Sequence, residues 1–181
     1  MRRLFTVLAL VVLALTVSVG TLLAGPKGTE LPFKGKATGT STVATGGPSV
    51  FTTTSEGKFI GSHVGKGTYE GGSTQTWGPV DGGNPECDDS VFGAVTGWIE
   101  FTAANGDMLH ATAQAGSILC EVDPGDLTTY ESTIIYEIIW GTGRFYGATG
   151  TFTSKSVHTR PDALSGSDDV GTWKGTINYN K

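Results

Sequence analysis

The chain has 181 residues, of which 28 are Gly and only 16% are charged, with a formal net charge of −5. Gly is about twice its usual share of roughly 7%, and both Gly and the abundant Thr form helices poorly, which argues against a helical bundle. The glycines have no three-residue period, which excludes collagen, and a hydrophobic content of 38% excludes a disordered chain.

The N-terminal segment differs from the rest of the chain. Arg2 and Arg3 precede an uncharged apolar run over residues 4–24. This order is typical of a secretory signal peptide, but the run is also long enough to span a bilayer as an uncleaved anchor. We therefore interpret residues 1–24 as a signal peptide or N-terminal anchor, 25–30 as a linker and 31–181 as one domain. In either case we expect the domain to function outside the cytoplasm, secreted or anchored.

The charge of the domain restricts its partners. Removing Arg2 and Arg3 from the twelve basic residues leaves ten against seventeen acidic residues, a formal charge of −7. No basic run occurs in the domain. Nucleic acid is therefore not an expected partner, and membrane contact is expected only through an uncleaved N-terminal segment.

Apolar alternation and β-branched runs, separated by Gly, Pro and Asn, predict eight or nine strands. A long antiparallel sheet usually closes on itself to remove its edges, and glycines inside strands suit tight bends. We predict an all-β fold, a single closed antiparallel barrel of about eight strands, with a sandwich as the alternative. Loops are expected over 71–85 and 161–169, and the strands over 31–40, 50–54, 58–69, 94–103, 108–115, 117–122, 127–140, 151–159 and 171–179.

Two cysteines, Cys87 and Cys120, form an even pair that predicts a disulfide in an exported protein. The bridge would close a loop of about 34 residues and contribute roughly 3 to 4 kcal/mol; two separate thiols are the alternative. A bridge would gather six carboxylates at one end of the molecule, as a solvated acidic rim or, less favoured, a Ca²⁺ site. They are Glu86, Asp88, Asp89, Glu121, Asp123 and Asp126.

Asn105-Gly106 predicts a β-hairpin whose register decides the role of Glu100. A two-residue turn places Glu100 on an apolar face with Trp98, where desolvation favours general-acid use. A three-residue loop with Gly106 as a bulge instead places Glu100 opposite His110 and outside the core. The second register separates polar from apolar residues better, and we favour it.

The long strand over 127–140 has an aromatic face that includes Tyr136 and Trp140. We assign this face to the barrel interior, where the Tyr136 hydroxyl needs a protein or ligand partner. Tyr136 and Trp140 are therefore candidates for ligand contact, and Trp98 is a third candidate. His63 lies in a Gly-rich predicted strand and can face either way.

No cofactor or metal is otherwise expected. The three histidines lie on separate predicted strands without metal-ligand spacing, which argues against zinc. They are His63, His110 and His158.

The segment Gly141-Thr142-Gly143-Arg144-Phe145-Tyr146-Gly147-Ala148-Thr149-Gly150 predicts one helical turn that plugs a barrel end, with glycines at positive φ. Arg144 either pairs with a carboxylate to fix this turn or faces the cavity mouth to hold an acidic ligand group. The glycine spacing misses the dinucleotide-binding pattern by one residue.

The segment also resembles the Gly-Thr-Gly-Arg-Phe-x-Gly-Ala-x-Gly motif of allene oxide cyclases and plant dirigent proteins. Supporting stretches occur in the same order over 61–67, 103–109 and 171–177. The chain is more similar still to secreted bacterial members of this calycin-like barrel superfamily that have no assigned function. The resemblance implies a barrel whose cavity holds a hydrophobic or aromatic molecule. It transfers no catalytic residue to this chain.

Three functions follow from this, in order of preference. The first is an exported barrel that binds a small apolar or aromatic molecule, and the second is a structural or surface barrel that is packed solid. The third is a cofactor-independent cyclase, isomerase or radical-coupling guide that shapes its substrate in a dry cavity. Its weak catalytic candidates are Glu100, Tyr136, His63 and Arg144.

Overall fold

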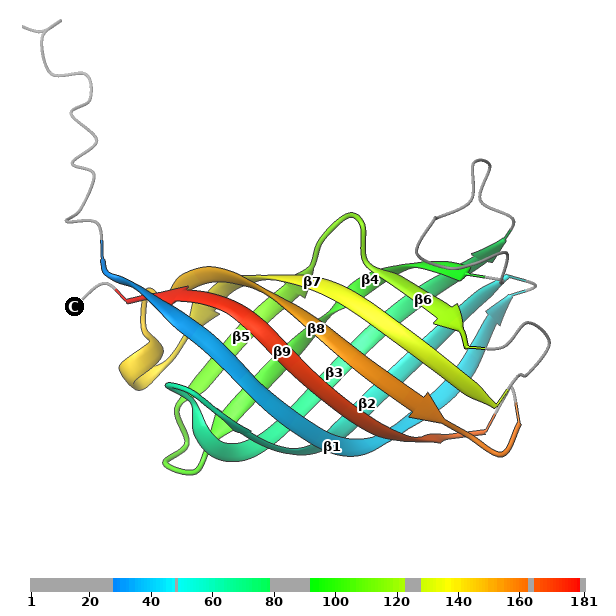
Figure 1. Ribbon diagram of the computed structural model, residues 1–181, viewed down its shortest axis with the longest axis horizontal. Coiled ribbons are helices and arrows are strands. Elements are labelled where there is room, and N and C mark those ends of the chain that lie inside the picture. The colour runs from blue at the N-terminus through cyan, green and yellow to red at the C-terminus, as the bar shows by residue number, and fades with distance from the viewer. Residues whose placement is uncertain (1–27, 48, 79–91, 123–127, 163–164, 180–181) are drawn as a thin grey trace, which may run out of the picture.

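The computed structural model describes residues 28–47, 49–78, 92–122, 128–162 and 165–179 (Figure 1). Within them lie nine β-strands and one short 3-10 helix. Their bounds in chain order are β1 (Glu30–Gly47), β2 (Val50–Gly61), β3 (Gly65–Gly78), β4 (Phe92–Ala103), β5 (Met108–Ala113), β6 (Ile118–Glu121), β7 (Thr129–Gly141), η1 (Gly143–Phe145), β8 (Thr149–Thr159) and β9 (Ser167–Asn178).

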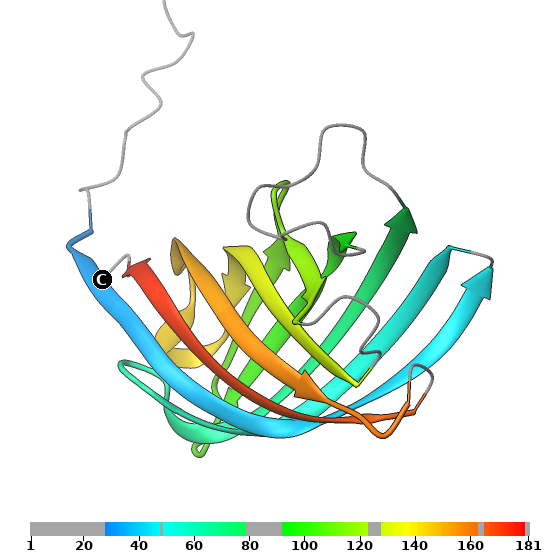
Figure 2. The same ribbon diagram turned by 45° about the vertical axis from the view of Figure 1, so that its right-hand side comes forward.

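The strands form one antiparallel sheet that closes on itself. The order is β3-β2-β1-β9-β8-β7-β5-β4-β6, and a further pairing of β3 with β4 completes the circle. β5 and β6 each pair with both β4 and β7, so these two short strands share one place between them. Nine strands therefore fill eight positions. The predicted closed barrel is confirmed, and the sandwich is excluded (Figures 1 and 2).

The segment predicted as one strand over 58–69 contains a turn instead. β2 ends at Gly61 and β3 begins at Gly65, with Gly61 and Gly65 directly opposed. His63 lies at the tip with a φ of 66°, and Val64 turns back into the core. The prediction failed because a left-handed His is an uncommon way to make a turn, and no Asn-Gly pair signals it.

Parts of two segments predicted as loops are strands instead. β3 continues to Gly78, into the segment predicted as a loop over 71–85. The loop over 161–169 ends earlier, because β9 starts at Ser167. Both missed segments are strands that carry polar side chains on their inner face, so hydrophobic alternation could not reveal them.

One half of the barrel interior is packed solid with apolar side chains. Phe145 and Ala148, from the segment that contains η1, are buried against the strand ends, as the plug prediction required. Gly143 and Gly147 have positive φ angles there. Most of the cluster is aromatic and aliphatic: Phe33, Phe59, Val64, Phe101, Leu109, Ile138, Phe145, Phe152, Trp173 and Ile177.

A close approach explains one strand glycine in this core. A Cβ atom at Gly35 would overlap the indole of Trp173, which lies against β1. The same indole contacts the rings of Phe33 and Phe59 at centroid distances of 5.8 and 6.1 Å. Trp173 therefore packs into the core because Gly35, and also Gly61, leave room for its indole.

The β4–β5 hairpin has the register that the sequence favoured, with a three-residue loop and Gly106 as a bulge. Glu100 is directly opposite His110, and Phe101 is opposite Leu109 in the core. The amide of Ala103 donates to the carbonyl of Asp107 at 2.9 Å, and Gly106 has a φ of 85°, as a three-residue loop requires. The prediction that Glu100 and His110 form an outward pair is confirmed.

A β-bulge in β7 overturns the predicted face of Trp140. His110 is opposite Trp140 but Ala111 is opposite Ile138, so Ile139 is an extra residue in the ladder. Because strand faces alternate with a period of two, one extra residue reverses the residues that follow. Trp140 is consequently on the outer face and 39% exposed.

Candidate functional site

The other half of the barrel interior holds a cavity of about 110 Å³. Its floor is the boundary of the packed core, at Tyr69, Phe101, Tyr136, Phe152 and Trp173. Its walls combine aliphatic side chains, among them Val43, Val95 and Leu119, with short hydroxyl side chains: Ser41, Thr53, Ser55, Ser73, Ser132, Ser154, Ser156 and Ser167. Since one water needs about 10 to 15 Å³ of such a cavity, this one has room for several waters or one small molecule.

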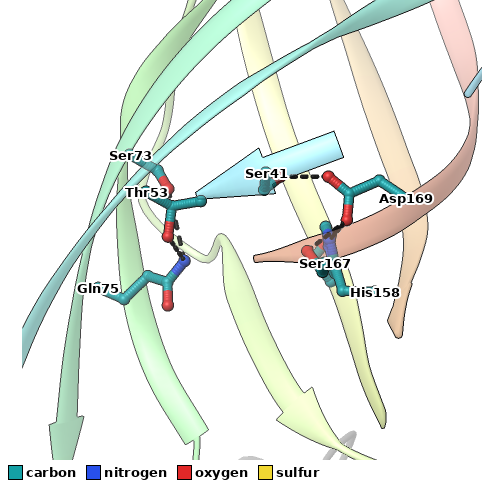
Figure 3. Close-up of polar contacts among 8 residues, drawn as sticks. Ser41, Thr53, Ser73, Gln75, His158, Ser167 and Asp169 are labelled. Atoms are coloured by element: carbon teal, nitrogen blue, oxygen red, sulfur yellow. Dashed lines mark hydrogen bonds and ion pairs between the residues drawn. The ribbon is translucent and has the colours of Figure 1, made fainter. Parts of the chain in front are cut away.

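A buried carboxylate organises one wall of the cavity. Asp169 is 6% exposed and accepts hydrogen bonds from the hydroxyls of Ser41 and Ser167, the second at 2.7 Å. Its Oδ1 also lies 2.8 Å from Nδ1 of His158. Figure 3 shows these groups converging from β1, β8 and β9. Strand register brings them together, since Asp169 is directly opposite both His158 and Gly39.

His158 extends this network to a third strand. Its Nε2 lies 2.9 Å from Oγ of Ser132, which is on β7 and 4% exposed. The imidazole keeps 21% of its side-chain surface accessible, whereas Asp169 keeps 7%. Ser132, His158 and Asp169 thus form a linear serine–histidine–aspartate chain along the cavity wall.

Hydrogen-bond donors around Asp169 stabilise its negative charge. Burial alone would raise the pKa of this carboxyl, but hydrogen bonding to His158, the charge of His158, and the hydroxyls of Ser41 and Ser167 outweigh it and leave the pKa below its usual value. Asp169 is therefore ionised at neutral pH. An ionised carboxylate accepts the Nδ1 proton of a neutral imidazole and leaves Nε2 as an acceptor facing Ser132.

Arg160 adds a buried positive charge to the same cavity. It is 8% exposed, and its guanidinium lies 3.9 Å from the centre of the Tyr130 ring. Burial lowers its pKa, and the neighbouring Tyr130, Asp169 and Asp162 oppose this shift. An arginine keeps its charge under such conditions, so this half of the interior contains both signs of charge.

Two tyrosine hydroxyls lie at the depth where the polar and apolar halves meet. Burial, followed by the charge of Asp169, raises the pKa of Tyr69 to about 12. Burial, followed by Tyr69, raises the pKa of Tyr136 far above its usual value. Both hydroxyls are therefore protonated donors at neutral pH. Tyr136 faces the interior as predicted, with its ring stacked on Phe152 at 5.0 Å.

Another part of the cavity wall carries an amide. Nε2 of Gln75 donates to Oγ1 of Thr53 at 3.1 Å and lies 3.5 Å from Oγ of Ser73 (Figure 3). These residues belong to β2 and β3, away from the strands that carry the histidine network. The cavity thus offers hydrogen-bonding groups from separate parts of its wall.

Several predicted site residues lie away from this cavity. His63 is exposed in the β2–β3 turn, with its ring 5.7 Å from that of Tyr179. Glu100 faces outward, with Oε2 3.4 Å from Nδ1 of His110. Trp98 borders the cavity, but its indole stacks on His110 and is 40% exposed. The inward face predicted for Trp140 is therefore wrong, whereas Trp98 as a ligand contact stays a prediction.

Arg144 fixes the plug segment. Its Nε lies 3.6 Å from Oδ2 of Asp107, and Nη2 donates to the carbonyl of Val64 at 3.0 Å. Its guanidinium also lies 4.7 Å from the ring centre of Phe145. These contacts match the turn-fixing interpretation. They place the side chain at the packed end, and Arg144 does not border the cavity.

The predicted disulfide and calcium site fall mainly outside the described residues. Cys87, Glu86, Asp88, Asp89, Asp123 and Asp126 all lie there. Cys120 is half-buried on β6 and Glu121 is buried beside it. Both sites stay predictions. Among the described residues there is no group of three or more metal-ligating side chains, and no helix is long and apolar enough to cross a membrane.

No pattern in the sequence pointed to Ser132, His158 and Asp169 as one site. Ser154, Ser156 and His158 alternate along β8, and Arg160 continues the pattern just after it, which marks one polar face and is a usable signal. A polar face is normally read as the solvent side, so the alternation alone points the wrong way. Asp169 was hidden because its segment was predicted to be a loop.

Comparison with known proteins adds little beyond the architecture. No protein-family model matches the chain, and no curated protein matches it. Among solved structures, the pterocarpan synthase dirigent protein is similar with a TM-score of 0.41 and 14% sequence identity. The match covers 91% of this chain and 98% of that one. A likeness at this level carries no information about activity.

Proposed function

We propose that the protein binds a small molecule inside the open half of its barrel. The observation that carries this is the contrast within one interior, where a solid apolar core gives way to a cavity whose lining adds hydroxyl and charged groups to apolar side chains. Burying an aspartate, a histidine and an arginine costs free energy that apolar side chains would not. Such groups gathered around a cavity are a common mark of a binding site.

The lining defines the chemistry of the ligand. The floor is aromatic, from Tyr136, Phe152 and Trp173, and suits an apolar or aromatic body. The walls present hydroxyl donors and acceptors, the Gln75 amide and the Arg160 guanidinium. The ligand we propose is therefore small, with an apolar or aromatic part and several hydrogen-bonding groups. This adds hydrogen-bonding groups to the small apolar or aromatic ligand expected from sequence.

We further propose that this binding takes place outside the cytoplasm. The support is the sequence pattern of residues 1–24, which lie outside the described part of the chain. Secretion and anchoring predict different mature N-termini, so mass spectrometry of the protein from its own source distinguishes them. The same preparation, measured under native conditions, would reveal a co-purified ligand as additional mass.

A matched pair of substitutions tests the binding site. Ser154 faces the cavity, whereas its neighbour Lys155 is exposed on the outside of β8. Ser154→Phe should fill the cavity and abolish binding, and Lys155→Phe should leave binding unchanged. Saturation-transfer NMR with phenol, benzyl alcohol and benzoate provides the readout, and circular dichroism checks folding. Equal binding by both variants would contradict the proposal.

A further inference from the structure

Ser132, His158 and Asp169 have the geometry of an activated nucleophile. The serine hydroxyl lies 2.9 Å from Nε2 of the imidazole, and the carboxylate lies 2.8 Å from Nδ1. Both distances are those expected between nucleophile, base and orienting group. Three adjacent strands, β7, β8 and β9, hold them rigidly, and all three side chains border the cavity.

The direction of the hydrogen bonds also fits. Asp169 accepts from the hydroxyls of Ser41 and Ser167, which fix its orientation independently of the histidine. The carboxylate then holds the Nδ1–H tautomer of His158, so Nε2 faces Ser132 with its lone pair. When the ring is neutral in this tautomer, the hydroxyl donates to Nε2, which is the arrangement that removes a proton from a serine.

If Asp169 served only to stabilise the fold, its hydrogen bonds to serine hydroxyls would be enough, and it would not need the contact with His158. The hydroxyls of Ser41 and Ser167 already donate to Asp169 from two sides. The imidazole adds a third donor and couples it to a hydroxyl at the surface of the cavity. The result is an oriented base beside a space that admits a small molecule.

We propose that Ser132 is a nucleophile for acyl transfer, with His158 as its general base and Asp169 as a positioning residue. The proposal rests on the proposed function, because the substrate must occupy the same cavity. The substrate class is small esters, since about 110 Å³ accommodates only a short acyl group with a compact leaving group. The Tyr69, Tyr136 and Arg160 side chains supply donors within this cavity for a carbonyl oxygen or an anionic substituent.

The chemical steps balance with water as the second substrate. The Oγ of Ser132 bonds to the ester carbonyl carbon while its proton moves to Nε2 of His158. The carbon–oxygen bond to the leaving group then breaks, and His158 returns the proton to the departing alcohol. Water attacks the acyl-serine and gives a proton to His158, which passes it back to Oγ as the acid is released. The net reaction is ester plus water to acid plus alcohol.

Covalent labelling tests the nucleophile directly. Methanesulfonyl fluoride forms a bond between its sulfur and a serine oxygen and releases fluoride, and it is small enough for this cavity. We expect one adduct on the full chain, located at Ser132 by peptide mass spectrometry. Ser132→Ala should abolish this adduct. His158→Asn should lower the rate of its formation by about 10²- to 10⁴-fold. Hydrolysis of methyl acetate, measured by the acid that it releases, should fall in parallel.

His110→Asn is the matched control, because His110 also pairs with a carboxylate but faces outward. It should leave labelling and hydrolysis unchanged. Ser132→Cys guards against loss of folding, since a thiol beside His158 should react rapidly with iodoacetamide at that position. Asp169 is tested by the pH profile of labelling, which Asp169→Asn should displace. The groups facing the imidazole are Asp169 on β9, Tyr130 on β7 and Arg160 beyond the end of β8.

The outcomes separate this proposal from the binding function. An adduct at Ser132 that needs His158 supports it. No adduct, an adduct at another serine, or equal labelling of His158→Asn overturns it. If ligand binding still depends on Ser154 while Ser132 does not react, the binding function holds and the nucleophile does not exist. If no probe binds and no serine reacts, both proposals fail.

Discussion

The barrel contains two histidine–carboxylate pairs that are built alike and placed oppositely. Glu100 and His110 are directly opposed on β4 and β5, and His158 and Asp169 are directly opposed on β8 and β9. The outer pair is separated by 3.4 Å and the inner pair by 2.8 Å. The two imidazoles have nearly equal exposure, 18% outside and 21% inside, so burial of the ring does not distinguish them.

The surroundings make the difference. The ring of His110 lies between the indoles of Trp98 and Trp140, at 5.6 and 5.1 Å and nearly parallel to both. The ring of His158 instead contacts a hydroxyl and a carboxylate through its two nitrogens. The outer histidine is thus used as a flat surface, and the inner one as a proton donor and acceptor. The same pair of residue types is a packing element on one face and a hydrogen-bonded chain on the other.

The largest contrast should be in stability on removing each carboxylate. Asp169→Ala leaves two buried hydroxyl donors and the partly buried His158 without their acceptor and should lower the free energy of unfolding by about 3 to 5 kcal/mol. Glu100→Ala breaks a partly exposed pair and should cost about 0 to 1 kcal/mol. Urea unfolding followed by circular dichroism measures both. Equal losses would show that the interior network contributes no more than a surface ion pair.

The pH dependence of the unfolding free energy should distinguish the inner pair further. The folded state holds the pKa of Asp169 below its usual value of 3.8, so its stabilising contribution is present above that pH and is lost as pH falls through the folded pKa. The difference in unfolding free energy between the wild type and Asp169→Asn should therefore shrink as pH drops below about 3.8. Urea titrations at pH 7, 5 and 3 would show this. Val157→Ala, which removes only exposed apolar surface, should give an offset that does not vary with pH.

The polarity of the barrel interior decides how many of the strands, and which of their faces, could be predicted from the sequence. Where the interior is apolar, as along β5 and the first half of β1, alternation predicted both the strands and their faces. Where it is polar, as along β8 beyond Phe152 and at Asp169, alternation gave the strand but not its direction, or gave a loop. Hydrophobic period reports which side is apolar, and that side is the inside only in the packed half.

The prediction that Trp140 faces the interior failed for a separate reason. Its face follows from counting residues along β7, and the count is reset by the bulge at Ile139. The bulge depends on pairing with β5, a partner that is distant in the chain. Local sequence carries no mark of it, whereas the Asn105-Gly106 turn and the Gly141–Gly150 plug are local and were predicted correctly.

The smallest effect should distinguish stacking from charge in the outer pair. His110→Ala removes the ring between two indoles and should cost about 1 kcal/mol, the usual value of an aromatic contact. His110→Phe keeps a flat ring and loses only the interaction with Glu100, so it should be close to wild type in urea unfolding. If His110→Phe were as unstable as His110→Ala, the ion pair would hold the ring in place and the indoles would not. The same exchange inside, His158→Phe, should be poorly tolerated, because it leaves Ser132 without its acceptor and one face of Asp169 without its donor.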